Sequence, residues 1–209
     1  MTSSIVEDIQ LLSDSRSAKR RSAAKRLRKV GDPAAGPALL AALQKELQDV
    51  RTWETQYQMI MAIGHCNYRE ALPFIESRQI SGMIADAIGD TVVRLARAHD
   101  HDAAAALAFL DAGKTIFMTG ALQAVAVLRM VPDVATMRRL VEYGLSLQLG
   151  RGNDDWTAIW LLRAAPGWPA EIVAPLLDYW GTVPFPQQQQ IHGAVELARK
   201  RKYDKWSPL

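Results

Sequence analysis

Two histidine-containing segments are the first candidates for chemistry. The run 99–102 is His-Asp-His-Asp, and such side chains bind zinc, but a zinc site needs about four ligands and no second His/Cys cluster completes the set. We therefore expect this run to end one helix and start the next, with Asp102 as a cap. His65 and Cys66 pair a base with a thiol, but no orienting third group accompanies them, so we expect a structural role. No catalytic, metal-binding or cofactor-binding residue is predicted.

Tryptophans are concentrated in one part of the chain. Four of the six fall within a short stretch, namely Trp156, Trp160, Trp168 and Trp180. The first two are four residues apart, so they share one face of a helix. Tryptophan is enriched at binding hot spots, which makes the region a candidate partner-binding surface. The alternative is that these side chains fill the core between repeats, which requires no function.

The loop before Trp156 carries two adjacent carboxylates, Asp154 and Asp155. An aspartate beside an aromatic cleft could stabilise a cationic base, as in DNA-glycosylase chemistry. We expect instead that one of the two aspartates is the N-cap of the following helix, because aspartate is among the preferred residues at that position.

A basic helix is the strongest surface feature of the sequence. On a helical wheel, four cations cluster on one side: Arg21, Lys25, Arg28 and Lys29. The opposite side carries a narrow apolar stripe of Ala23, Leu27 and Val30. Unbalanced positive charge could contact phosphates or an acidic protein, whereas an ordinary solvated face would have no partner. The lack of interleaved aromatic residues weakens the case for nucleic acid.

Composition bounds the class of protein. The 209 residues are 49% hydrophobic, enough for one compact domain or one solenoid with a sizeable core. No apolar run reaches the roughly 18 to 20 residues of a membrane span, and residues 1–10 lack a signal-peptide pattern. A single cysteine, Cys66, excludes an internal disulfide and fits a reducing compartment. We expect a cytoplasmic protein without a membrane partner.

The net charge of +3 is unevenly distributed. Residues 16–30 carry eight basic groups and no acid, and residues 199–205 carry five basic groups and one acid. The segment between them, 31–198, has 12 basic and 18 acidic residues. Both flanks are therefore basic and the body is acidic, which bears on partners rather than on the fold.

Apolar residues spaced by three and four predict helices separated by short turns. After a first basic helix, Asp32 is the expected N-cap and Pro33 the first residue of the second helix. Later helices are expected at 50–63, 70–77, 83–98, 102–110, 116–130, 133–147, 156–165, 170–180 and 187–202. The first of these offers four side chains for burial: Trp53, Tyr57, Ile60 and Met61.

Turn motifs recur along the chain. An Asp-x-Arg pattern occurs at 14–16 and again at 49–51, and residues 31–33 form a Gly-Asp-Pro turn. Prolines that precede apolar pairs lie at 37, 73 and 175, separated by 36 and 102 residues, and 102 is three times 34. A period in the thirties indicates stacked supersecondary units.

The stretch 20–43 resembles a HEAT repeat, and 49–75 is similar to a second one. The resemblance is strong over about residues 14–80 and mainly periodic from 81 to 200. It implies a superhelix of antiparallel helix pairs whose surfaces bind partners, usually proteins. Because the same family includes adaptors, bilin lyases and DNA-alkylation repair enzymes, the fold alone does not settle the function.

We therefore predict an all-α, right-handed α-solenoid of five to six HEAT-like helix pairs that forms one domain, residues 1–209. Repeats are expected at about 14–48, 49–80, 81–112, 113–149 and 150–182, followed by a capping helix at 185–205. Basic residues at the end of that helix complement its dipole and give the end of the stack a polar face.

The predicted function is a non-catalytic protein-interaction scaffold, with an adaptor or an immunity-type neutraliser of a partner protein as specific cases. The expected partner is another protein, bound through the tryptophan region or the basic helix. The alternative is nucleic-acid binding through the basic flanks, including base repair of the HEAT-like glycosylase type.

Overall fold

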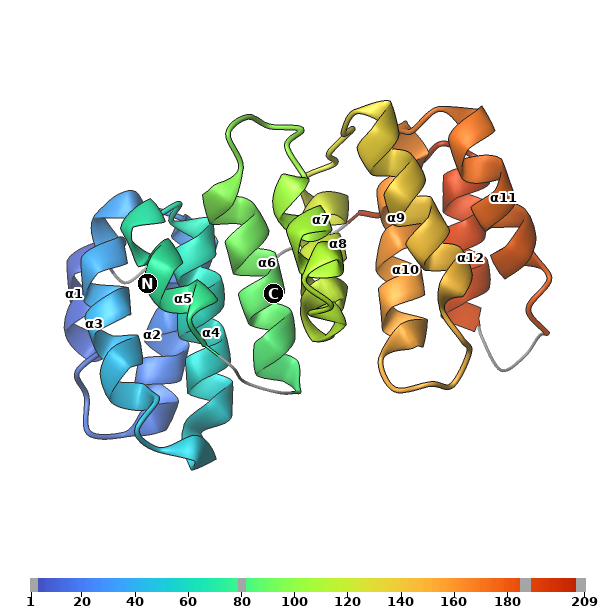
Figure 1. Cartoon of the computed structure of the whole chain (residues 1–209). Helices are drawn as coiled ribbons and strands as arrows, with labels where there is room; N and C mark the ends of the chain where they lie inside the picture. The colour runs from blue at the N-terminus through green and yellow to red at the C-terminus, as the bar shows by residue number, and fades with distance from the viewer. Residues whose placement is uncertain (1–3, 79–81, 185–188, 206–209) are drawn as a thin grey trace. The chain divides into compact units, whose positions relative to one another are not determined.

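The computed structural model describes residues 4–78, 82–184 and 189–205. In these ranges the chain forms twelve α-helices and short 3-10 turns, and no strand (Figure 1). It divides between Ala96 and Arg97 into two compact units with six helices each. The all-α prediction is confirmed.

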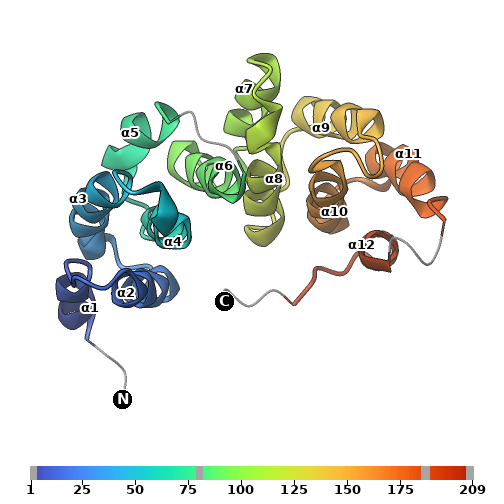
Figure 2. The same ribbon diagram turned by 90° about the horizontal axis from the view of Figure 1, so that it is seen from below.

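Unit 1 consists of two layers of helices (Figure 2). The first layer is formed by α2 (Ser17–Val30), α4 (Trp53–His65) and α6 (Met83–Ala96), which pack side by side. The second layer is formed by α1 (Ile5–Leu11), α3 (Gly36–Glu46) and α5 (Leu72–Glu76). Each second-layer helix packs on the first-layer helix that follows it, so the unit is a stack of three helix pairs.

Unit 2 repeats this arrangement. Its first layer is formed by α8 (Met118–Val127), α10 (Asp154–Ala164) and α12 (Gln189–Arg199), and α10 packs against both neighbours. Its second layer is formed by α7 (Ala104–Asp111), α9 (Val134–Ser146) and α11 (Ala170–Gly181). Such stacked pairs, each covering an apolar face of the next, are the packing of an α-solenoid of HEAT-like repeats. The superhelix handedness and the repeat boundaries stay predictions.

Two helices, α3 and α4, are preceded by a 3-10 turn that an aspartate caps. Asp32 accepts a hydrogen bond of 2.9 Å from the backbone N–H of Ala34, so the predicted cap is confirmed, although α3 itself begins only at Gly36. Asp49 likewise accepts a hydrogen bond of 3.0 Å from the N–H of Arg51, and α4 begins at Trp53 rather than at residue 50. The Asp-x-Arg motif therefore marks helix starts.

The structure corrects three expectations in unit 1. Helix α1 was not expected, and its capping box joins Ser4 to Glu7. Val30 is 63% exposed because it is the last residue of α2, beyond the face that Ala23 and Leu27 bury. Trp53 is 42% exposed because it is the first residue of α4. The apolar stripe is thus narrower than the helical wheel indicates.

The proline period holds for two positions and fails at the third. Pro37 and Pro73 are each the second residue of their helices, α3 and α5, where a missing N–H costs no hydrogen bond. Pro175 lies inside α11 instead, on its exposed side. There the proline removes the N–H that would otherwise donate to the carbonyl oxygen of Glu171. Pro175 therefore does not mark the start of a helix, as the other two prolines do.

The last helix is present but ends at residue 199, before the expected end at about 202, so only Arg199 of the expected basic residues lies in its last turn. Helix α12 spans Gln189–Arg199, and Ile191 and Val195 bury its apolar side. The expected start at residue 187 lies outside the described residues. Over the part of the chain that the structure describes, every helix is too short or too polar to cross a bilayer.

Candidate partner-binding site

The four cations of the predicted basic ridge differ in their surroundings. Arg21 forms an ion pair with Glu54 of α4, so its charge is compensated. Lys25 and Lys29 are exposed, and neither forms an ion pair with any described residue. Arg28 is only 6% exposed. The ridge is therefore two solvated lysines beside one nearly buried arginine, not a uniform solvent-facing face of four cations.

Arg28 lies at a polar junction of α2, α4 and α6. Its Nε is buried and has no hydrogen-bond partner among the described residues. On α6, by contrast, the buried Arg94 donates a hydrogen bond of 2.5 Å to Asp90, which is fully buried. The Nε of Arg94 is thus satisfied within unit 1, whereas the Nε of Arg28 has no hydrogen-bond partner among the described residues.

His65, the last residue of α4, belongs to the same junction. Burial, helped by the positive charges of Arg94 and Arg28 and opposed by Asp90, lowers its pKa to about 4. The imidazole is therefore neutral at neutral pH, and its buried Nε2 has no partner in the described part of the chain. His65 makes no hydrogen bond to Cys66 that could activate a thiol.

Cys66 is fully buried, and this burial raises the pKa of its thiol to about 11. Its Sγ lies 4.0 Å from the carbonyl oxygen of Leu27, a weak hydrogen bond that joins α4 to α2. A thiol with this pKa stays protonated at neutral pH and is a poor nucleophile. The geometry supports the predicted structural role.

The tryptophans of unit 2 do not form one surface. Trp156 is 47% exposed, whereas Trp160, Trp168 and Trp180 are buried. The indole N–H groups of Trp168 and Trp180 donate hydrogen bonds to backbone oxygens in the core, at 2.9 and 3.1 Å. Three of the four candidates therefore contribute to packing in this structure, and only Trp156 among them offers a large apolar surface to a partner.

The two aspartates before Trp156 organise a loop rather than cap the helix. The N-cap position belongs to Asn153, and Asp154 and Asp155 are the first two residues of α10. Asp154 accepts a hydrogen bond of 2.9 Å from the N–H of Gln148, and Asp155 one of 2.8 Å from that of Gly150. The expected N-cap was wrong by one position, because both carboxylates reach back to the loop instead.

The His-Asp-His-Asp run joins two helices, as predicted. Asp102 accepts hydrogen bonds from the N–H groups of Ala98 and Ala104, at 2.8 and 2.9 Å, and so holds the start of α7. His101 Nδ1 accepts a hydrogen bond of 3.1 Å from the N–H of Val131. Across the described ranges, no group of three or more His, Cys, Asp or Glu side chains is arranged to hold a metal ion.

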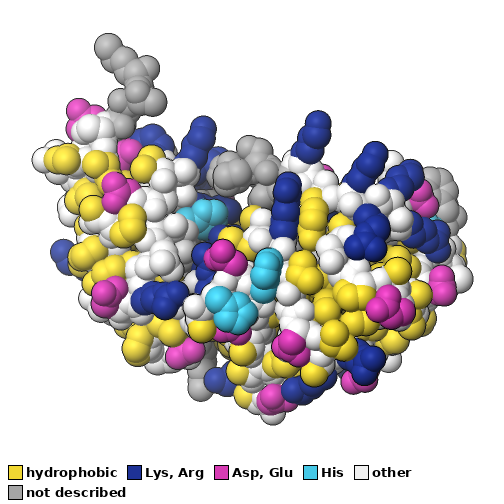
Figure 3. Space-filling view, turned by 90° about the horizontal axis from the view of Figure 1, so that it is seen from above, with side chains coloured by type: hydrophobic (Ala, Val, Ile, Leu, Met, Phe, Trp, Pro, Cys, Tyr) yellow, Lys and Arg dark blue, Asp and Glu magenta, His cyan; other side chains and the backbone are white. Residues whose placement is uncertain are grey.

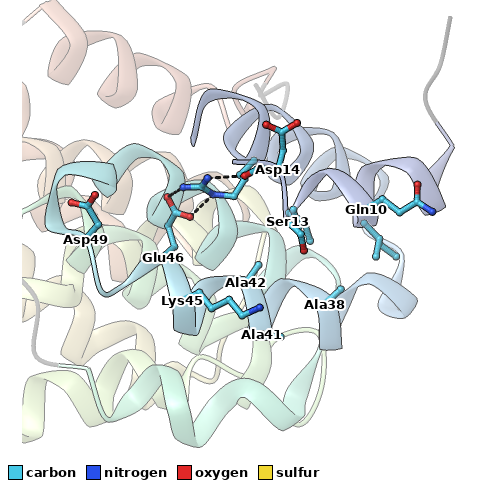
Figure 4. Close-up of a pocket in the computed structure, with 12 residues that line it drawn as sticks. Gln10, Ser13, Asp14, Ala38, Ala41, Ala42, Lys45, Glu46 and Asp49 are labelled. Carbon is cyan, nitrogen blue, oxygen red and sulfur yellow. Dashed lines mark hydrogen bonds and ion pairs between the residues drawn. The ribbon is translucent and has the colours of Figure 1, made fainter. Parts of the chain in front are cut away.

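A pocket that the sequence did not predict lies between α1, α2 and α3, with a volume of about 540 Å³ (Figure 4). Alanines of α3 form its apolar wall, and Asp14, Glu46 and Asp49 lie at its polar side. Arg20 binds Glu46 at 2.6 Å, and hydrogen bonds from Arg51 lower the pKa of Asp49 to about 2. Because these carboxylates are held ionised by cations, none is suited to act as a general acid at neutral pH.

Charges of both signs are interspersed on the surface that Figure 3 shows, where Lys and Arg side chains stand out among hydrophobic and acidic ones. A uniformly basic face, as expected for a duplex-binding groove, does not appear in this view. The kind of partner must therefore be inferred from local clusters of side chains rather than from the net charge of the protein.

The comparison with protein families agrees with the fold. A family model described as PBS lyase HEAT-like repeat matches residues 19–45, which cover most of α2 and α3. This match and the stacked helix pairs support a HEAT-repeat family. No curated protein and no solved structure matches the chain significantly. The protein is thus a HEAT-like helical repeat protein by fold.

Proposed function

We propose that this protein is a non-catalytic scaffold that binds another protein. The observation that supports it most is the exposed Trp156, in a unit whose other three tryptophans in the same region are buried. Transferring an exposed indole from water into an interface is favourable, because its apolar surface is then buried. Tryptophan is also prominent among interface hot spots.

Exposed apolar residues gather at the starting ends of the first-layer helices. In unit 2, a hydrogen bond of 2.7 Å between Thr119 and Thr157 places the first turns of α8 and α10 side by side, and Ile116 and Trp156 lie there, each 47% exposed. We call Ile116 and Trp156 the apolar rim. Exposed apolar side chains on adjacent turns are more typical of an interface than of a solvated surface.

In unit 1 the corresponding helix ends carry Val50, Trp53 and Met83, which are also exposed. A hydrogen bond of 2.8 Å between Ser17 and Thr55 joins the first turns of α2 and α4 in the same way. The same type of surface at the same place in both units supports a scaffold that uses its helix ends for binding.

Affinity capture from the native host tests this function. The immobilised protein should retain a host protein, and the double variant Ile116→Ser/Trp156→Ser should lose it while keeping its helical circular dichroism. Retention of no protein, together with turnover of a substrate by the purified chain, would refute the scaffold. A cytoplasmic adaptor and an immunity-type neutraliser are then separated by whether the captured protein keeps or loses its own activity.

A second candidate function is nucleic-acid binding, which the exposed and unpaired Lys25 and Lys29 favour. Counterion release would make the logarithm of the affinity fall steeply with the logarithm of the salt concentration. Replacing both lysines with glutamine should then lower both the affinity and the slope. Lack of binding to DNA and RNA at low salt would exclude this candidate.

A further inference from the structure

Residues 200–205, which we call the C-terminal strap, follow α12 and turn back past α10 toward α8 (Figure 2). The ring centre of Tyr203 lies 5.0 Å from the guanidinium carbon of Arg129, the residue after the C-cap of α8. Asp204 Oδ2 lies 3.5 Å from Arg163 Nη2, in the last turn of α10. The strap therefore lies on the C-terminal ends of α8 and α10, whereas the apolar rim lies near their N-terminal ends.

Two arginines at this contact have a backbone conformation that arginine rarely adopts. Arg129 has a φ of 52°, in the left-handed region, and Arg201 in the strap has a φ of 53°. Both directly follow the C-cap of a helix, a position where glycine is favoured. Asn67, which follows α4 in the same way, is less unusual because asparagine tolerates this region. Unfavourable backbone geometry at residues that build one contact is common at functional sites.

Gly167, in the 3-10 turn after α10, completes the surroundings of the tyrosine. A Cβ at this position would collide with the hydroxyl oxygen of Tyr203, so the docked position of the ring requires glycine. Burial raises the pKa of Tyr203, and the charge of Arg129 and a backbone hydrogen bond from Gly167 oppose this effect. The ring thus lies on a cation, its hydroxyl meets the backbone, and the carboxylate of the next residue meets Arg163. This set of groups suits a tyrosine that is followed by an acid.

The strap fills this site incompletely. An ion pair of 3.5 Å is long, and the Nε of Arg163 has no hydrogen-bond partner among the described residues. A carboxylate that accepts from two nitrogens of a guanidinium in a fork binds it more strongly. Arg163 and Asp204 line a groove of about 350 Å³ against α12, and the side chain of Asp204 is 40% exposed. An incoming segment can therefore displace Asp204 from Arg163.

The strap also brings positive charge to a site that is already positive. Three of its cations form no ion pair with any described residue: Arg201, Lys202 and Lys205. The charges of Arg129 and Arg201 both act on Tyr203, so two like charges lie near one ring. Glu196 borders the groove, but its carboxylate is paired with Lys200 at 3.0 Å. A segment that carries acids beside its tyrosine would replace this repulsion with attraction.

We propose that the strap covers a peptide-binding site of unit 2 whose ligand is a segment of a partner protein, with a tyrosine followed by an acid and flanked by further acids. The tyrosine of the partner replaces Tyr203 on Arg129, and the following carboxylate replaces Asp204 on Arg163. Because strap and partner compete, the apparent affinity is lowered by the fraction of molecules in which the site is open. This inference goes beyond the apolar rim of the proposed scaffold, and the two surfaces are tested separately.

A peptide fits this site better than a nucleic acid or a second copy of the chain. The strap that occupies it is itself a peptide, and Gly167 is placed to meet a phenol hydroxyl. Bases bind by stacking on aromatic side chains, but Trp160, which lies against Arg163, is only 7% exposed. The strap of a second copy would bring the same unpaired cations as the strap already there, so it gains no advantage.

The probe is a fluorescein-labelled hexapeptide, Glu-Glu-Tyr-Asp-Glu-Glu, whose binding to the whole chain is measured by fluorescence anisotropy. The control peptide, Glu-Glu-Ser-Asp-Glu-Glu, has the same charge and no ring. Tyr203→Ser opens the site without a change of charge. It should bind the tyrosine peptide about fivefold more tightly than the wild type does, since the exposed contacts of the strap are individually weak. The serine peptide should bind both proteins equally.

Arg129→Gly, added to Tyr203→Ser, should abolish the preference for the tyrosine peptide over the serine peptide. Glycine suits the left-handed φ of this position, so the helical circular dichroism should be unchanged. Asn67→Gly, added to Tyr203→Ser instead, makes the same backbone change after α4 and should keep the preference.

Equal affinity of the wild type and Tyr203→Ser for the tyrosine peptide would overturn the proposal, as would a preference for this peptide that survives Arg129→Gly. Tighter binding of a thymidine hexanucleotide than of the tyrosine peptide would also overturn it. So would a wild-type dimer that Tyr203→Ser dissociates in size-exclusion chromatography, because the occupant would then be a second copy. Capture of a host protein through Ile116 and Trp156 tests the scaffold separately, since these residues lie near the other ends of the helices.

Discussion

The indole N–H of Trp168 donates a hydrogen bond of 2.9 Å to the carbonyl oxygen of Met130, 38 residues earlier. Trp168 follows α10 and Met130 follows α8, so this bond joins the ends of adjacent first-layer helices. Trp180 makes the equivalent bond to Gly144, at 3.1 Å, between α11 and α9. The buried tryptophans of unit 2 therefore hold successive helix pairs in register.

Replacing Trp168 with phenylalanine should lower the free energy of unfolding by about 1–3 kcal/mol, because the buried carbonyl of Met130 loses its donor and a small void remains. Urea unfolding followed by circular dichroism measures the change. Trp156→Phe is the matched control, and its stability should stay within about 0.5 kcal/mol of the wild type because Trp156 is half-exposed. Equal stability of the two variants would contradict this role of Trp168.

Gly64 allows α4 and α6 to approach closely. A Cβ at this position would lie 2.9 Å from Thr91 Oγ1 and 3.1 Å from Thr91 Cα, and the latter is backbone that cannot turn aside. Gly64→Ala should therefore destabilise the protein by about 1–3 kcal/mol. Gly193→Ala in α12, where a Cβ meets nothing within 4 Å, should instead stabilise it by up to about 1 kcal/mol. Thermal unfolding of both variants tests this, because the melting temperature should fall in Gly64→Ala and rise in Gly193→Ala.

The pair of Arg20 and Glu46 stabilises the junction of α2 and α3 at the pocket between α1 and α3. Burial alone would raise the pKa of Glu46, but the hydrogen bonds from Arg20, Thr52 and Ser17 and the charge of Arg20 together outweigh this effect and lower it. Glu46→Gln should cost about 3 kcal/mol of stability, because the part-buried Arg20 loses its counter-ion. Asp111→Asn, which breaks the exposed pair with Arg139, should cost less than about 1 kcal/mol. Urea unfolding measures both changes. Similar losses of unfolding free energy in the two variants would contradict the expectation that the buried ion pair contributes more than the exposed one.

The sequence predicts the helices well because their determinants are local. Apolar spacing and caps act within a few residues, and the structure confirms the cap at Asp32. Asp102 accepts a hydrogen bond from the N–H of Ala104, but the N-cap position of α7 is one residue later, at Ala103. Helix starts were less accurate, since 3-10 turns such as Val50–Thr52 carry helix-like spacing without being α-helix. Helix α1 was missed because its seven residues are too few to show a clear apolar period.

Exposure could not be predicted in the same way, because it depends on neighbours distant in sequence. Arg28 belongs to a basic run, yet it is buried in α2, which packs against α4. Trp168 and Trp156 are both tryptophans near α10, and only the former finds a backbone acceptor, 38 residues away. Two hydrogen bonds between side-chain hydroxyls span the same separation of 38 residues, Ser17 to Thr55 and Thr119 to Thr157. Hydroxyl residues at this spacing are the sequence signal from which the register of the first-layer helices could have been predicted.

His65 should make the stability depend on pH. Its folded-state pKa of about 4 lies below the unfolded value of about 6.5, so the unfolded chain binds the additional proton in this window. The stability contributed by neutral His65 is therefore complete above about pH 6.5 and is lost as the pH falls toward 4, by about 3 kcal/mol. The groups that set this shift besides burial are Arg94, Asp90 and Arg28.

The loss is measured as the difference between the urea unfolding curves of wild type and His65→Leu at pH 7 and at pH 4.5. Carboxylates that titrate in the same range contribute equally to both proteins and cancel in this comparison. His99→Leu, at an exposed position, should keep the wild-type pH profile. A profile for His65→Leu that runs parallel to the wild type would show that His65 is not buried as a neutral imidazole.

The most direct test of the scaffold is the dissociation constant of the host protein that the chain captures, measured by calorimetry for wild type, Trp156→Ala and Trp168→Phe. We expect Trp156→Ala to weaken binding by about tenfold or more at unchanged stability, as for an interface hot spot. Trp168→Phe should be less stable yet bind with the wild-type affinity at a temperature where it is folded. Wild-type affinity in Trp156→Ala, with the loss in Trp168→Phe instead, would contradict the account.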